Sequence, residues 1–209
     1  MNKLLIIIII IITTLSSCSK QEDVTINKLE EEDGNFLPLS VGNYWIYEVS
    51  QVDTNGNSTF QKIDSTYIDS DTTINNNIYF VIKSSASISY IQFLRDSSGY
   101  IVDDNGQKYL YQRLIDDTLY TNLLKSFLGD TLSFTYRKMS KPPTKIYCGL
   151  GYLTALDAEV TRYLAYTKTT AYAHYYYSSN IGLIRRQDYF SFTGKRTEYS
   201  LIRYMINNP

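Results

Sequence analysis

The chain has few of the residues that metal sites, disulfide scaffolds and nucleic-acid interfaces need. Among its 209 residues there are one histidine and two cysteines. One imidazole excludes a histidine-cluster metal site, and two cysteines exclude a disulfide-rich scaffold and the cysteine-rich zinc folds. The chain also lacks a basic excess, since 20 Lys and Arg against 21 Asp and Glu give a net charge of −1. A nucleic-acid-binding protein normally carries such an excess. We therefore expect no metal, no cofactor and no nucleic-acid partner.

The apolar run near the N-terminus, residues 4–12, is about half as long as a membrane-spanning helix requires. Lys3 is the only charge before it, and Thr13 and Thr14 follow it. A positive start, a short apolar segment and small residues are the layout of a secretory signal peptide. Here the small residues end at a cysteine, in Leu15-Ser16-Ser17-Cys18.

This last segment resembles the lipobox of bacterial lipoproteins, which reads Leu, two small residues and Cys. The resemblance implies cleavage after residue 17, a diacylglycerol thioether on the Cys18 sulfur, and an acyl chain such as palmitate on the new amino group. More than one acyl chain holds a protein stably at a membrane, whereas a single chain binds only marginally. The alternative is an ordinary signal peptide with a cysteine there by chance. We expect residues 1–17 to be removed and Cys18 to be the lipid anchor.

Residues 18–35 are polar, acidic and poor in aromatic side chains, so we interpret them as a flexible tether. Within them, Ser19-Lys20-Gln21-Glu22-Asp23 resembles the surface-export signal of Bacteroidota-type lipoproteins. That resemblance implies an outer-membrane protein exposed at the cell surface. The alternative is a solvated linker, which leaves the protein on the periplasmic side of the membrane.

From residue 36 to 209 the sequence predicts one all-β domain, mainly antiparallel. Short stretches rich in aromatic and β-branched residues alternate with turn residues, among them Asn55-Gly56 and Asn105-Gly106. The expected strands are 44–49, 60–69, 78–83, 89–95, 100–103, 108–114, 131–138, 145–152, 159–167, 171–177, 183–192 and 196–206. A curved sheet, an open barrel and a sandwich all fit this pattern.

Two segments depart from the strand pattern. Leu119, Leu123 and Phe127 are spaced by four, which predicts a helix over residues 116–128, with Asp116 or Asp117 as the cap. Threonine and tyrosine at positions 118, 120 and 121 suit a strand equally well. Lys141-Pro142-Pro143 predicts a loop, because proline cannot donate a hydrogen bond within a central strand.

Two motifs resemble segments of Bacteroidota-type outer-membrane lipoproteins, a family without known activity. Pro38-Leu39-Ser40-Val41-Gly42-Asn43-Tyr44-Trp45-Ile46-Tyr47 resembles the start of their domain. Asn180-Ile181-Gly182-Leu183-Ile184-Arg185 resembles a motif near its end. The resemblance implies a β-rich envelope lipoprotein and transfers no catalytic residue.

The first motif also has a physical interpretation without the family. Gly42 and Asn43 form a turn, and Trp45, Tyr47 and Val49 share one apolar face, so the motif serves folding. In the second motif Asn180 replaces the usual glycine. Because Asn tolerates left-handed geometry, the same turn remains available ahead of Gly182.

Residues capable of catalysis are sparse, and we expect no enzyme. His174 is the sole imidazole, and no Gly-x-Ser-x-Gly elbow accompanies it. Cys148 is alone once Cys18 carries lipid, and we expect a small buried side chain rather than a reactive thiol. The Asp103-Asp104 pair suits a turn. The segment from Asp53 to Asn57 lacks the glycine and glutamate of a calcium loop, so it too predicts a turn.

Tyrosine is the unusual feature, with 21 of 209 residues. The densest point predicts a binding surface made of Tyr172, His174, Tyr175, Tyr176 and Tyr177. Tyrosine offers a wide contact area with a hydrogen-bonding tip, which suits a glycan or a peptide. The alternative is that these residues stabilise strands through cross-strand pairs.

The C-terminal basic residues have two interpretations as well. Arg185, Arg186, Lys195, Arg196 and Arg203 could meet lipid phosphates. We expect instead that they occupy solvated positions on edge strands, where charge discourages aggregation.

The function we expect is that of a non-enzymatic surface module, held to the membrane by lipid, that binds a glycan, a peptide or an envelope protein. Such a module needs a contiguous exposed tyrosine patch. The alternative is a periplasmic carrier of lipid or lipoprotein, or an envelope-assembly factor. A carrier needs an apolar interior without tyrosine hydroxyls. A hydrolase would need His174 or a carboxylate pair inside a pocket.

Overall fold

The computed structural model describes residues 34–207, apart from 86, 113–116 and 190–192. These residues belong to one compact unit. The expected signal peptide, the lipid-bearing Cys18 and nearly all of the tether lie outside the described residues. The described part contains no helix long and apolar enough to cross a membrane.

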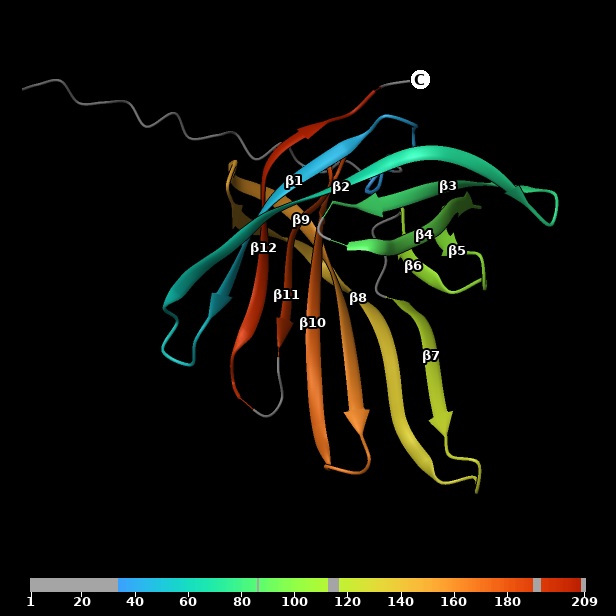
Figure 1. The fold of residues 1–209 in the computed structure, drawn as a ribbon, viewed down its shortest axis with the longest axis vertical. Helices are drawn as coiled ribbons and strands as arrows, with labels where there is room; N and C mark the ends of the chain where they lie inside the picture. Colours follow the sequence, from blue (N-terminus) through green and yellow to red (C-terminus); the bar gives the residue numbers. More distant parts are fainter. Residues whose placement is uncertain (1–33, 86, 113–116, 190–192, 208–209) are drawn as a thin grey trace, which may run out of the picture. The chain divides into compact units, whose positions relative to one another are not determined.

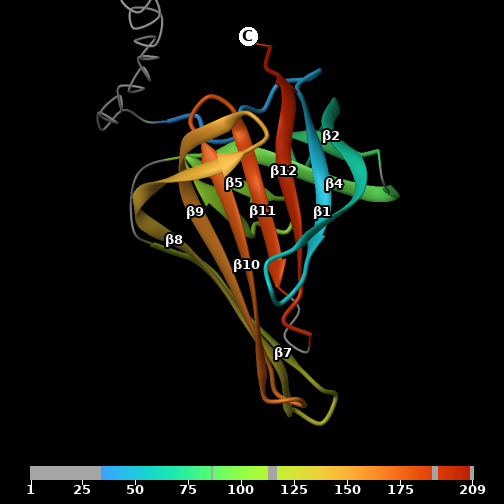
Figure 2. The same cartoon turned by 90° about the vertical axis from the view of Figure 1, so that its left-hand side faces the viewer.

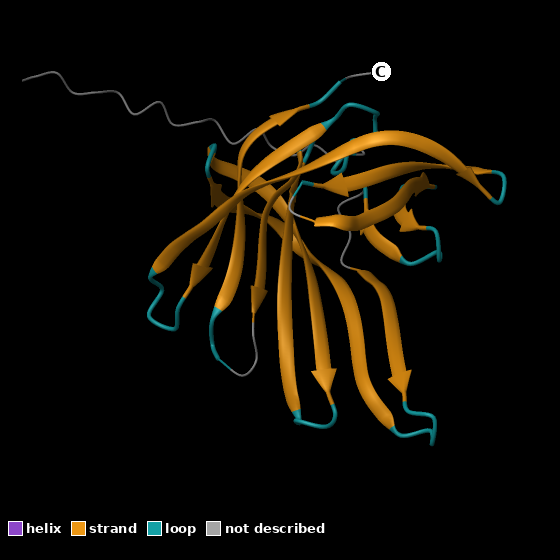
Figure 3. Cartoon of the chain, in the orientation of Figure 1, coloured by secondary structure: helices purple, strands orange, loops and turns teal. Residues whose placement is uncertain are grey.

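Within the described residues the chain forms twelve strands, and none of it is helical (Figure 3). The strands are β1 (Tyr44–Val52), β2 (Ser58–Ile74), β3 (Asn77–Ser84), β4 (Ser87–Ser97), β5 (Tyr100–Asp103), β6 (Lys108–Tyr111), β7 (Asp117–Lys125), β8 (Thr131–Cys148), β9 (Gly151–Leu164), β10 (Thr169–Ser178), β11 (Gly182–Tyr189) and β12 (Arg196–Met205). The expected all-β class is confirmed.

All twelve strands belong to one sheet with the order β6-β5-β4-β3-β2-β1-β12-β11-β10-β9-β8-β7. Each strand pairs with its neighbours in sequence, except that β6 and β7 form the two edges of the sheet and the first strand pairs with the last. The sheet therefore consists of two six-stranded meanders, β1–β6 and β7–β12, joined at its centre by the antiparallel pairing of β1 with β12 (Figure 1).

The sheet curls until its two edges nearly meet. The Tyr111 amide in β6 donates to the Met139 sulfur in β8 at 3.2 Å, and Arg137 Nη1 donates to the Tyr109 carbonyl at 2.9 Å. Because every strand lies in the same curled sheet, the sandwich alternative is wrong. We call the concave side the inner face and the opposite side the outer face.

The expected helix over 116–128 is wrong, since the described part of that segment is the strand β7 and a turn. Leu119 is buried, whereas Leu123 is 48% exposed and Phe127 is fully exposed, so their spacing does not make one buried face. Pairing with β8 satisfies the backbone of β7 along its length and overrides the four-residue spacing. The expected cap Asp116 lies outside the described residues.

The expected loop at Lys141-Pro142-Pro143 is also wrong, because β8 continues through it. The register with β9 shifts there: Ser140 faces Asp157, but Thr144 faces Ala155. The prolines thus occupy a bulge, in a part of β8 that has left β7 behind and pairs with β9 alone. Proline is tolerated at bulges and on edges.

The strand boundaries that follow the bulge also differ from the expected ones. The segment expected as one strand over 145–152 is a hairpin, in which β8 ends at Cys148 and β9 begins at Gly151. This hairpin crosses the outer face of β11 and β12 (Figure 2). The Gly149 amide donates to Ser200 Oγ at 3.0 Å, and Arg185 Nη1 donates to the Tyr147 carbonyl at 3.0 Å. Cys148 is a free and fully buried cysteine beneath it.

The two sequence motifs meet in the core, where the first has the folding role expected of it. Asn43 is fully buried, donates to the Pro38 carbonyl at 2.9 Å and accepts from the Asn207 amide at 2.8 Å. Trp45 is buried and its indole donates to the Ile181 carbonyl. Asn43 therefore ties the start of the domain to its end.

Gly182 supports the same contact. It has a φ of 105°, and an added Cβ would lie 2.9 Å from Trp45 Nε1. The expected left-handed Asn180 is confirmed with a φ of 59°. The C-terminal motif thus provides the close backbone approach that buries the only tryptophan of the sequence.

Candidate functional site

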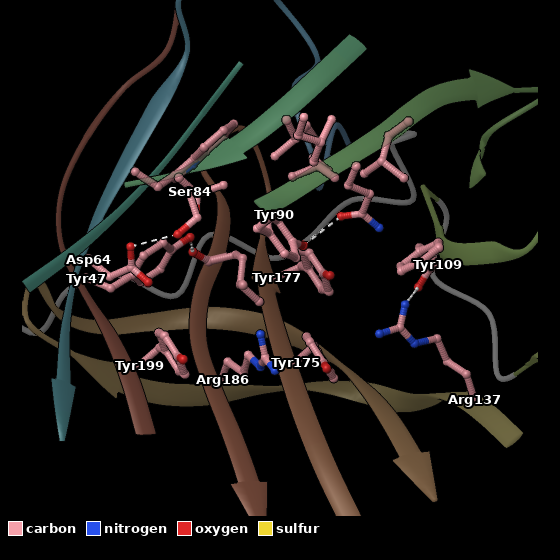
Figure 4. Close-up of a pocket in the computed structure, with 18 of the residues that line it drawn as sticks. Tyr47, Asp64, Ser84, Tyr90, Tyr109, Arg137, Tyr175, Tyr177, Arg186 and Tyr199 are labelled. Atoms are coloured by element: carbon pink, nitrogen blue, oxygen red, sulfur yellow. Dashed lines mark hydrogen bonds between the residues drawn. The ribbon is translucent and has the colours of Figure 1, made fainter. Parts of the chain in front are cut away.

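The inner face encloses a pocket of about 580 Å³, which is within the usual size range of small-molecule sites (Figure 4). Strands of both meanders contribute to its walls. Six tyrosines line it: Tyr47, Tyr90, Tyr109, Tyr175, Tyr177 and Tyr199. Arg137 and Arg186 are its arginines, and Trp45, Ile82, Leu94 and Leu183 are among its apolar side chains.

Arg137 is the most unusual residue of this pocket, since only 3% of its surface is exposed. Its guanidinium carbon lies 4.8 Å from the centre of the Tyr109 ring and 4.7 Å from the centre of the Tyr175 ring. Nη1 donates to the Tyr109 carbonyl, but the buried Nε has no hydrogen-bond partner among the described residues. Burying a charge without full pairing is costly.

Arg186 stands on the other side of Tyr175. The register places Tyr175 on β10, Arg186 on β11 and Tyr199 on β12 directly beside one another. The Arg186 guanidinium lies 5.2 Å from the centre of the Tyr175 ring and 5.1 Å from that of Tyr199. Its Nη2 pairs with Asp188 Oδ2 at 2.7 Å, so this cation already has a carboxylate partner. Stacking on aromatic faces orients both guanidinium groups.

Burial favours the neutral phenol form of several lining tyrosines. Burial raises the pKa of Tyr177 to about 12 and the pKa of Tyr47 well above its usual value. Burial also raises the pKa of Tyr90 and Tyr199. Tyr47, Tyr90, Tyr177 and Tyr199 therefore supply phenol hydroxyls to the pocket rather than negative charge.

The carboxylate that lines the pocket is Asp64. It is buried, accepts from Ser84 Oγ at 2.9 Å and lies 4.0 Å from Lys62 Nζ. Asp64 is therefore already engaged by neighbouring side chains. Of the described lining cations, Arg137 is the one with an unsatisfied buried donor.

The structure divides the predicted tyrosine surface between the two faces. Tyr175 and Tyr177 line the pocket. Because side chains alternate along a strand, Tyr172, His174 and Tyr176 face outward from β10. The five residues do not form one surface.

His174 lies outside the pocket, on the outer face. Its Nδ1 is 2.8 Å from Asp157 Oδ2, and its ring stacks on Tyr176 with centroids 5.9 Å apart. The hydrogen bond to Asp157 raises the pKa of His174 above its usual value, against the opposing effect of burial. His174 is thus not among the residues that line the pocket, where a hydrolase would need it.

The expectation that the C-terminal arginines occupy edge strands is wrong. They lie on β11 and β12, which are central in the sheet. Arg186 faces the pocket, while Arg185 on the outer face pairs with Glu198 through Nη2 and Oε1 at 2.6 Å. The pocket arginines and the tyrosines at 47, 90, 109 and 199 were missed as site residues. The period-two alternation of Tyr175 and Tyr177 was the available signal.

Three residues expected to be structural behave as predicted. Cys148 is a small buried side chain, and burial raises the pKa of its thiol. Asp53 holds a turn, since its Oδ1 accepts from the amides of Asn55 and Asn57 at 2.9 and 2.8 Å. Asp103 does the same for Asn105 and Gln107.

The site and sheet define a class of protein, a curled antiparallel sheet with a tyrosine- and arginine-lined interior. Two solved structures resemble this fold. One is a predicted lipoprotein from Parabacteroides distasonis, with a TM-score of 0.44 and 14% sequence identity. The other is a predicted exported protein with a YmcC-like fold from Bacteroides fragilis, with a TM-score of 0.45 and 16% identity. Each similarity covers 81% of this chain and 98% of the other.

No protein-family model matches the chain, and no curated protein matches it in sequence.

Proposed function

We propose that this chain is a lipid-anchored outer-membrane lipoprotein that catalyses no reaction and binds a small ligand with an anionic group in its pocket. The single observation that carries the binding proposal is the unpartnered Nε of the buried Arg137. A carboxylate or a phosphate that approaches the Arg137 guanidinium from the pocket would pair with its charge. The lipobox at Cys18 supports the anchor.

Acidic sugars are the ligand class that this wall favours. Tyr90 lines the pocket, is 43% exposed and offers an aromatic face for a sugar ring, and the phenols offer hydrogen bonds for its hydroxyls. Arg137 takes the acidic group. We also propose that this binding occurs at the cell surface.

A second candidate is a periplasmic carrier of an acidic lipid. Leu37, Ile82, Leu94 and Leu183 line the same pocket and would accept an acyl chain while Arg137 holds the headgroup. The tyrosine hydroxyls argue against a cavity for an uncharged lipid.

Isothermal titration calorimetry on the chain from Ser19 onward tests the proposal. The probes are glucuronate, galacturonate, glucose 6-phosphate and dodecanoate, with glucose as the neutral control. We expect an acidic sugar to bind and glucose not to bind. Arg137→Met should weaken binding at least about thirtyfold, because truncating one partner of a buried charge pair costs ~2–5 kcal/mol. Arg203→Met, on an exposed side chain, is the matched control.

The same variant separates a ligand-binding residue from a structural one. Replacing buried ionic groups by apolar side chains of similar volume is often neutral or stabilising, so the free Arg137→Met protein should unfold at the same urea concentration or a higher one. Tight binding of dodecanoate alone would favour the carrier. Absence of binding by every acidic probe, or equal affinity in Arg137→Met, would overturn the proposed pocket.

A further inference from the structure

Two hairpins of the second meander, β7–β8 and β9–β10, end side by side and expose apolar side chains at their turns. Figures 1 and 2 both show the β7–β8 and β9–β10 turns at the same end of the sheet, which we call the distal end. The Ala165 amide in one turn donates to the Leu132 carbonyl beside the other at 3.0 Å. Phe127 is 104% exposed, Tyr166 is 95% exposed and Leu128 is 85% exposed.

An ordered turn holds the two apolar side chains of the β7–β8 hairpin away from the sheet. The Ser126 amide donates to the Asp130 carbonyl at 2.8 Å, and the Gly129 amide donates to the Ser126 carbonyl at 3.0 Å. Ser126 Oγ accepts from the amides of Leu128 and Asp130. The side chains of Phe127 and Leu128 thus take no part in the hydrogen bonds that hold the turn, and both remain exposed.

The apolar surface continues from the turns onto the outer face of the sheet. The cross-strand register aligns Leu123 on β7 with Phe134 on β8, and Phe134 with Tyr163 on β9. These side chains are 48%, 38% and 40% exposed. Contiguous apolar surface of this kind marks a site of interaction.

The charges beside the turns suit an anionic bilayer. Lys125 ends β7, and Lys168 lies in the β9–β10 turn, against the single carboxylate of Asp130 in the β7–β8 turn. Aromatic and aliphatic side chains flanked by lysine are the composition of membrane–water interfaces, where the rings enter the headgroup layer and the ammonium groups meet lipid phosphates.

The chain that precedes the described residues is long enough to let the distal end reach the membrane of the anchor, a step that rests on the proposed lipid on Cys18. Asn35 lies at the opposite end of β10, where its carbonyl accepts from the Asn180 amide at 2.8 Å. The ten residues of β10 span about 33 Å. Residues 19–35 can span about 60 Å when fully extended.

We propose that the distal end inserts Phe127, Leu128 and Tyr166 into the surface of an anionic lipid bilayer. Insertion supplements the acyl chains and orients the sheet with its distal end on the membrane. The bilayer, rather than a groove of a partner protein, suits convex turns whose side chains point outward from two separate hairpins.

Vesicle flotation tests this proposal with the chain from Ser19 onward, which lacks acyl groups. The vesicles contain phosphatidylethanolamine and phosphatidylglycerol at 3:1, with phosphatidylcholine vesicles for comparison. We expect flotation with the anionic vesicles and a weaker association with phosphatidylcholine. The double variant Phe127→Ser/Leu128→Ser should lower the partition coefficient at least tenfold. Ile78→Ser, at an exposed apolar residue of the β2–β3 hairpin, is the matched control.

Two outcomes would overturn the insertion. One is the absence of flotation with anionic vesicles, and the other is equal flotation of the double variant. Concentration-dependent dimerisation that the double variant abolishes, without vesicle binding, would instead make a second copy of the chain the occupant. Arg137→Met should float like the parent chain, so failure of the pocket and failure of the distal end are distinguishable.

Discussion

The pairing of His174 with Asp157 gives the outer face a single titrating imidazole. Its pKa is raised, first by the hydrogen bond to Asp157. A group whose pKa is higher in the folded state than in the unfolded state stabilises the fold fully below the unfolded value, about 6.5 for histidine. That contribution is lost as the pH rises through the folded-state pKa.

We therefore expect Asp157→Asn to destabilise the chain more at pH 6 than at pH 9. The variant should also bring the pKa of His174 down toward its usual value. Urea unfolding at the two pH values measures the first effect, and the proton NMR signal of the only histidine measures the second. Asp71→Asn, at an exposed carboxylate, is the control. An equal loss at both pH values would show that the ion pair contributes nothing.

Single positions explain why the pocket could not be predicted from the sequence. Alternation predicts that Tyr175 and Tyr177 share a face, and they do. A bulge then interrupts the alternation of side chains along β11. Tyr176 pairs with Arg185 and Tyr177 pairs with Leu183, so Ile184 has no partner on β10. Because of that extra residue, Arg186 and Leu183 lie on the same face of the sheet, and no local sequence pattern predicts the bulge.

At the scale of elements, alternation and turn residues predicted most strands, and β5 has the expected bounds of 100–103. The failures have a common cause. The spacing of apolar residues in β7 fits a helix and a strand equally well. In β8 two prolines lie in a bulge at which β7 no longer pairs with β8. In both cases the secondary structure depends on whether another strand pairs with the segment, and local propensity does not predict such pairing.

The β2–β3 hairpin supplies a prediction at this scale. Ile74 pairs with Asn77, and the two residues between them, Asn75 and Asn76, have φ values of 48° and 61°. Such a turn favours Asn followed by Gly. Asn76→Ala should lower the free energy of unfolding by about 1 kcal/mol, because alanine is strained in left-handed geometry. Asn76→Gly should leave stability equal or higher.

Urea titrations of the two variants provide the measurement. Equal stability of the alanine variant and the parent would contradict a left-handed turn at this position.

At the scale of the whole molecule, the two meanders share one core and one central pairing. Trp45 lies in the first meander and Cys148 in the second, and both are buried. Because nine residue pairs join β1 to β12 and both meanders line the pocket, we expect the halves to unfold together.

In the chain from Ser19 onward, Cys148 is the only thiol. Tryptophan fluorescence and thiol modification should therefore change at the same urea concentration. Cys148→Ser, which cannot be modified, controls for reaction elsewhere. Thiol reaction at a lower urea concentration than the fluorescence change would show that the second meander opens by itself.

The pairing of the first strand with the last also sets the timing of folding. Of the described strands β1 is synthesised first, and its neighbour β12 is complete only when residue 205 has been made. Until then the nascent chain holds two meanders that each carry an unpaired edge where the middle of the sheet will be, and such edges recruit other chains. If translation stops ten residues early, most of β12 is missing. The two meanders are then not joined at the centre of the sheet, whereas loss of an edge strand would only narrow the sheet.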